Sequence, residues 1–237
     1  MSSAVSCDVL FEHPPHAAFG QPVPKSRIYA AGKPSRKVRD QMVQWVERIV
    51  WKYKLAPETI NLPASDSVPE IQVFELEMKQ ALDSDTLPEA VLRCIDRAVN
   101  FPIIFELTAS NGSDDAQRQI QVAAAYKRPN EAEAGKWVLG DYYATGWCPA
   151  DTPRKQLPVA VDMARLYEQM LRQMIPVQAR DNEPLKALVE RHGRIQVKQR
   201  EYQRLESKMY REKQFNRKVE LNCKLRALQA ELAALTE

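Results

Sequence analysis

Acidic and basic side chains alternate at the end of one predicted strand, where they could hold a metal ion and a water molecule. Glu75, Glu77 and Lys79 occupy every second position of the segment 70–79. Residues two apart on a strand face the same side, so the spacing matches the acid-x-lysine arrangement of magnesium nucleases, with Asp66 as a further carboxylate. There, paired carboxylates would hold Mg²⁺ and the lysine would orient or activate a water. A solvated strand end with a surface ion pair is the favoured alternative, since such triplets are frequent in a chain with 27% charged residues.

A basic stretch near the C-terminus offers a second kind of chemistry, the binding of phosphate groups. Residues 191–237 contain 12 Lys and Arg against 6 Asp and Glu, a net charge of +6, whereas residues 1–190 contain 22 against 25, a net charge of −3. A helix with such a row of cations would bind nucleic acid non-specifically and in a salt-dependent way. The alternative is a coiled coil with a solvated charged face. The nucleic-acid candidates are Arg204, Lys208, Arg211, Lys213, Arg217 and Lys218.

The same tail has the apolar spacing of a coiled coil. Apolar residues lie three and four apart over 202–209 and again over 221–235, with the polar segment 212–220 between these two heptad patterns. A helix this long needs a hairpin partner, a second copy or another protein, and the spacing leaves a single helix and a hairpin both open. We hypothesise that the polar segment docks on the globular body or on a partner. The partner-binding candidates are Gln214, Phe215, Asn216, Val219, Leu221, Leu225 and Leu228.

The elements that must position these residues begin after a proline-rich segment, 1–33, which we expect to be irregular with short extended pieces at 8–12 and 27–29. Ser35 is suited to an N-cap, and the apolar residues that follow share one helical face. This pattern predicts a helix ending before Pro57. The residues on that face are Val38, Met42, Trp45, Val46, Ile49 and Tyr53.

Strands and helices follow one another through the rest of the chain. The patterns predict strands at 70–78, 103–107, 120–127 and 137–147, a helix opened by Pro88, and an amphipathic helix from Met163 to Met174. They indicate an α+β domain over 34–180: a small, mixed or mostly antiparallel sheet of about four strands with helices on one face. A long helical, coiled-coil-like tail over 181–237 completes the predicted organisation.

Composition excludes several classes of protein. The chain has only 7 glycines, and they are too scattered for a phosphate-cradling Walker or Rossmann loop. We therefore expect no cofactor, except Mg²⁺ under the nuclease alternative. The absence of a signal peptide and of a long apolar run predicts a cytoplasmic protein without a membrane partner. The four cysteines lie far apart, so we expect them to be reduced and to hold no zinc.

An ordered set of phrases resembles a known family. EIQVFELEMK, IDRAVNFPIIFEL, AAAYKR, YYATGW, LYEQMLRQMIP and EKQFNRKVELN follow one another between about Arg27 and Leu228. Together they resemble an uncharacterised bacterial family, domain of unknown function 4391. The resemblance implies an accessory protein of restriction-like and anti-phage defence loci, often encoded near DNA methyltransferases and helicases. The resemblance implies a setting and carries over no catalytic residue.

Taken together, these patterns favour a non-enzymatic accessory or assembly subunit of a bacterial anti-phage or restriction-like system. Its helical tail would bind a protein partner, namely a methyltransferase, helicase or nuclease of the same system, or a second copy of itself. Basic residues of the tail would add contacts with DNA. The alternative is a metal-dependent DNA nuclease that uses Glu77 and Lys79. A third hypothesis is a plain nucleic-acid-binding module led by the basic tail.

Overall fold

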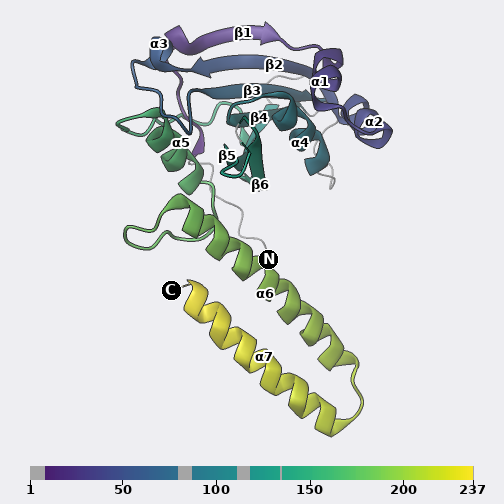
Figure 1. Ribbon diagram of the computed structural model, residues 1–237. Coiled ribbons are helices and arrows are strands. Elements are labelled where there is room, and N and C mark those ends of the chain that lie inside the picture. Colours follow the sequence, from purple (N-terminus) through teal and green to yellow (C-terminus); the bar gives the residue numbers. More distant parts are fainter. Residues whose placement is uncertain (1–8, 80–86, 111–117, 134, 237) are drawn as a thin grey trace. The chain divides into compact units, whose positions relative to one another are not determined.

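The chain forms two compact units, Met1–Met174 and Ile175–Glu237. The computed structural model describes residues 9–79, 87–110, 118–133 and 135–236 (Figure 1). The first unit holds the sheet. Its elements in chain order are η2 (Pro15–Ala17), β1 (Ala18–Pro22), α1 (Lys25–Gly32), α2 (Arg36–Trp45), β2 (Val46–Leu55), α3 (Pro57–Ile60), β3 (Ile71–Met78), α4 (Glu89–Ala98), β4 (Ile103–Ser110), β5 (Arg118–Pro129), β6 (Trp137–Ala144), β7 (Cys148–Pro149) and α5 (Met163–Arg172).

The sheet is mixed, as predicted, but it is larger than expected. Seven strands take part, in the order β1-β2-β3-β4-β5-β6 with β7 beside β5, so the expectation of about four strands is wrong. Among the described strands, β3 and β4 are the parallel pair, and the chain between them contains α4. The other neighbours are antiparallel. The α+β class is confirmed, and the strands beyond the predicted four are β1, β2 and β7.

Strand β2 accounts for the largest difference from the sequence prediction. The helix that begins after the Ser35 cap ends at Trp45, and Val46–Leu55 continue as a strand between β1 and β3. This segment, VERIVWKYKL, is rich in β-branched and aromatic residues, which suit a half-buried sheet surface. Tertiary pairing therefore overrides the helical spacing of its apolar residues. Similarly, Lys25–Gly32 form a helix where an extended piece was predicted.

One face of the sheet packs against α1, α2 and α4. Ile28 of α1, Met42 of α2 and Ile95 of α4 join Phe74 and Phe105 of the central strands in one buried cluster. Helices α1 and α4 approach closely at Gly32. A β-carbon placed there would lie 2.7 Å from the carbonyl oxygen of Cys94, so the contact needs a residue without a side chain.

A buried lysine joins the end of α4 to β5. The Nζ of Lys127 donates to the carbonyl oxygens of Asp96 at 2.6 Å, Val99 at 2.5 Å and Phe101 at 3.0 Å. It also lies 3.4 Å from the Asp96 carboxylate, which accepts a hydrogen bond from Tyr142. The lysine thus bonds carbonyl groups at and beyond the C-terminal end of the helix, and its charge faces the negative end of the helix dipole.

The second unit is a helical hairpin made of α6 (Leu185–Arg211) and α7 (Phe215–Thr236), which pack against each other (Figure 1). The long helical tail is therefore present, as two helices. Arg191, only 1% exposed, bonds Glu183 through two nitrogens at 2.8 Å each and the carbonyl oxygen of Leu235 at 2.8 Å. It thereby ties the start of α6 to the end of α7.

Two further expectations concern chemical setting. Within the described part of the chain, no helix has the length and apolar character needed to cross a membrane. Cys94 and Cys223 are free thiols. Cys148 is disulfide-bonded, so the expectation that all four cysteines are reduced is wrong for this residue.

Candidate functional site

The sheet carries a cluster of charged side chains on its central strands. Glu75 of β3 and Glu106 of β4 are direct neighbours across the parallel pair. Lys52 of β2 contacts both carboxylates, with its Nζ 3.4 Å from Glu75 and 2.9 Å from Glu106. We name this set the charged sheet face; its members are Arg48, Lys52, Glu75, Glu77, Glu106, Arg118 and Arg154.

Arginines complete the charge balance of this face. Arg118 lies 3.1 Å from Glu75, and Arg154 lies 2.6 Å from Glu106. Burial alone would raise the pKa of Glu106, whose side chain is only 3% exposed, but the hydrogen bond from Arg154 and the charge of Lys52 together lower it. The lowered pKa favours the ionised form of Glu106, which is buried beneath the partly exposed cations Lys52 and Arg154.

His13 lies close to these charges. Its ring packs on Tyr53 with centroids 4.5 Å apart, and its Nδ1 is a buried atom with no hydrogen-bond partner in the described chain. Burial lowers the pKa of His13 to about 4, against an opposing contribution from Glu106. The imidazole is thus neutral at physiological pH.

The structure brings together only part of the predicted acid-x-lysine site. Glu75 and Glu77 share Arg118, which lies 3.1 Å from the first and 3.8 Å from the second. Lys79, in contrast, lies 3.6 Å from Glu47, and among the described residues no ion pair joins it to Glu75 or Glu77. Asp66 is exposed in the loop that precedes β3, at the opposite end of the strand from Glu77. The lysine that pairs with Glu75 is Lys52, which the sequence did not single out.

The carboxylates of this face already have cationic partners. Glu77 accepts from Arg48 at 2.9 Å, and Glu75 and Glu106 are paired as above. In the residues that the structure describes, no group of three or more His, Cys, Asp or Glu side chains is arranged to hold a metal ion. The described geometry is that of an ion-pair network.

The turn between α6 and α7 exposes basic and aromatic side chains together. We name residues 204–218 the hairpin tip. Tyr210 is 76% exposed and Phe215 is 78% exposed. The tip contains six Lys and Arg against two Glu, a net charge of +4. All six predicted nucleic-acid candidates are exposed, and no carboxylate of the described chain lies within ion-pair distance of them.

The predicted partner-binding residues divide into two groups. Leu221, Leu225 and Leu228 are buried, which leaves their apolar surface unavailable to a partner in this state. Gln214, Phe215, Asn216 and Val219 are exposed at or near the start of α7. The structure therefore separates the seam that holds the hairpin from the residues that remain accessible.

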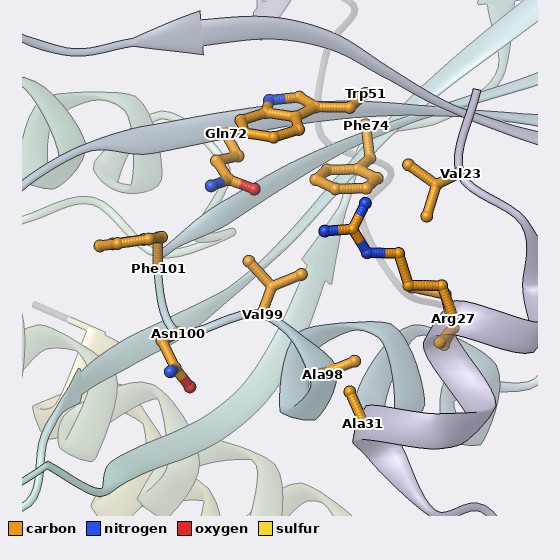
Figure 2. Close-up of a pocket in the computed structure, with 11 residues that line it drawn as sticks. Val23, Arg27, Ala31, Trp51, Gln72, Phe74, Ala98, Val99, Asn100 and Phe101 are labelled. Atoms are coloured by element: carbon orange, nitrogen blue, oxygen red, sulfur yellow. The ribbon is translucent and has the colours of Figure 1, made fainter. Parts of the chain in front are cut away.

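A pocket of about 250 Å³ lies on the other face of the sheet, where α1 and the end of α4 meet β2 and β3 (Figure 2). Trp51 and Phe74 form its aromatic wall, and Arg27 and Gln72 are among its polar residues. These residues come from separate elements, and Arg27 falls in a segment predicted to be extended, so no spacing in the sequence indicated the pocket.

Comparisons with known proteins give one match. Neither the curated proteins nor the solved structures contain a match to this chain. A family described as "Domain of unknown function (DUF4391)" matches residues 11–232, which include the sheet, the pocket, the hairpin tip and nearly all of α7. The match agrees with the resemblance found in the ordered phrases, and the chain belongs to the DUF4391 family.

Proposed function

We propose that the protein is a non-enzymatic accessory subunit of a bacterial anti-phage or restriction-like system, and that it binds nucleic acid through the hairpin tip. The observation that carries this proposal is the group of six exposed cations with no carboxylate of the described chain within ion-pair distance, beside two exposed aromatic rings. Cations of this kind replace the counterions of a phosphate backbone, and exposed rings can stack on unpaired bases.

The contrast within the hairpin supports this assignment. Near the base, Arg191 is bound to Glu183, and Lys198 pairs with Glu231 between the two helices. At the tip, Lys213, Arg217 and Lys218 have no such partner in the described chain, so their charge remains available to an external polyanion.

The exposed residues at the start of α7 also suit a protein partner. Phe215 and Val219 offer apolar contact beside the polar groups of Gln214 and Asn216. In this proposal a methyltransferase, helicase or nuclease of the same system, or a second copy of the chain, contacts these residues. The Phe215→Ala variant should no longer co-purify with such a partner, and its unfolding temperature should equal that of the wild type.

DNA binding measured by fluorescence anisotropy tests the main proposal. Replacing Lys213, Arg217 and Lys218 with Ala should weaken binding at least about tenfold and reduce the log–log salt slope by about three, because three phosphate contacts are lost. The matched control removes three exposed cations from the first unit, Arg36, Lys37 and Arg97. Equal affinity of the two variants, or no binding by the wild type at low salt, would overturn the proposal.

The nuclease alternative has a separate test. Incubation with DNA and Mg²⁺ or Mn²⁺ should leave the DNA intact, since Lys79 pairs with Glu47 and the carboxylates of β3 pair with arginines. Cleavage that disappears in Lys79→Ala would contradict the non-enzymatic assignment and establish the alternative.

A further inference from the structure

The pocket of the first unit has a wall of two parallel aromatic rings. Trp51 and Phe74 are directly paired across β2 and β3, and their rings are parallel to within 5° with centroids 6.1 Å apart. Ala31 of α1 and Val99, in the chain that follows α4, also line the cavity (Figure 2). The cavity is smaller than the roughly 300–1,000 Å³ typical of drug-sized ligands, so it suits a group of one or two rings whose attached groups lie at the rim.

A buried acceptor stands at one side of this wall. The side chain of Gln72 is almost fully buried, and its Nε2 donates to the carboxylate of Glu70 at 2.5 Å. Because a carboxylate only accepts, this bond fixes which way the amide is turned. Its Oε1 is then directed away from Glu70, on the side of the cavity (Figure 2). A ligand that donates an N–H group could bond this oxygen.

A cation stands at the other side. Arg27 of α1 lines the cavity, and Figure 2 shows its guanidinium turned toward Phe74. Its side chain has neither an ion-pair nor a hydrogen-bond partner among the described residues, and the residue is exposed. An unpaired guanidinium at the rim of a pocket matches the geometry of a phosphate or carboxylate group.

The chemistry that fits all three groups is a planar ring with an N–H donor on one edge and a phosphate attached at the other. We propose that this pocket binds a single nucleotide. Its base stacks along Trp51 and Phe74, its amine or imino group donates to Gln72, and its phosphate contacts Arg27. The ligand is either a free mononucleotide or one nucleotide unstacked from a single strand. This proposal uses residues of the first unit alone and stands independently of the hairpin tip.

Calorimetric titration of the full chain with the four ribonucleoside 5′-monophosphates tests the proposal. At least one should bind saturably below 1 mM, and the matching nucleoside without phosphate should bind more weakly. Arg27→Ala should weaken the nucleotide about tenfold while leaving the nucleoside unchanged, because it removes only the phosphate contact. Ala31→Trp, which fills the cavity from an exposed position, should abolish both. Lys37→Ala removes an exposed cation outside the pocket and should change neither.

The two sources of the ligand are separated by competition. In the variant with neutralised Lys213, Arg217 and Lys218, a single-stranded tetranucleotide should displace the mononucleotide if the pocket takes a base from a strand, and should fail to do so if the ligand is free. Either result supports a nucleotide site. No saturable binding of any mononucleotide, or binding that Arg27→Ala and Ala31→Trp leave unchanged, would overturn it. The tip is tested by DNA binding in anisotropy and the pocket by mononucleotide binding in calorimetry, so either proposal can fail alone.

Discussion

At the scale of single residues, two buried cations tie distant parts of the chain together. Lys127 is only 3% exposed and joins β5 to the end of α4, while Arg191 joins the ends of the hairpin. Each satisfies carbonyl groups near a helix end that would otherwise have no partner. Burial raises the pKa of Asp96 to about 6, although the neighbouring charge of Lys127 opposes this change.

Replacing Lys127 with Met should lower the free energy of unfolding by about 3–5 kcal/mol, since the buried Asp96 carboxylate and three carbonyl groups would lose their partner. Denaturant unfolding measures this change. Adding Asp96→Asn to the same chain should restore part of the loss, because the unpaired charge is removed. As a control, Lys136→Met alters an exposed lysine and should change stability by less than about 0.5 kcal/mol.

The Arg191–Glu183 pair predicts a dependence of stability on pH. The hydrogen bond from Arg191 lowers the pKa of Glu183 from 4.5 to about 2. A carboxyl group with a depressed pKa in the folded state adds stability above its unfolded value, and loses it as the pH falls from about 4.5 toward 2. Glu183→Gln should therefore unfold at a lower temperature than the wild type at pH 7, with the difference shrinking toward pH 3. A difference that stays constant over this range would contradict the assignment.

At the scale of elements, the regular segments with clear patterns were predictable. The strands at β3, β4, β5 and β6, and helices α4 and α5, lie where the alternation and helical spacing placed them. Strand β2 was not predictable, because its apolar residues also fit a helical spacing. Only its pairing with β1 and β3 makes this segment a strand. Lys79 shows the same limit for the candidate site. Two-residue spacing holds within a strand, but β3 ends at Met78, so nothing directs the next side chain toward the carboxylates.

The close approach of α1 to α4 gives the element-scale prediction. Gly32→Ala should lower the free energy of unfolding by about 1–3 kcal/mol, because the new methyl group would meet the carbonyl oxygen of Cys94 at 2.7 Å and its Sγ at 3.2 Å. Gly193→Ala is the matched control. It lies within α6 with nothing within 4 Å, so it should stabilise the chain by roughly 0.5–1 kcal/mol. Chemical unfolding of both variants checks the opposite signs.

At the scale of the whole molecule, charge and architecture divide the chain at nearly the same place. The acidic balance of residues 1–190 and the basic balance of residues 191–237 correspond closely to the sheet unit and the hairpin unit. Composition could therefore indicate where a polyanion binds, since charge is additive along the sequence. It could not indicate the pocket, because Arg27, Trp51, Gln72 and Phe74 meet only when α1 packs beside β2 and β3.

The length of the hairpin has a consequence of its own. From the Arg191 clamp to the end of α6 at Arg211 there are 20 residue steps, or about 30 Å at 1.5 Å each. This span is several times the Debye length of about 8 Å at physiological ionic strength. Salt therefore screens the charges at the end of α6 from the Arg191–Glu183 ion pair at the base of the hairpin. Evolution or engineering could change the charge at one end and leave the protonation and folding at the other end undisturbed.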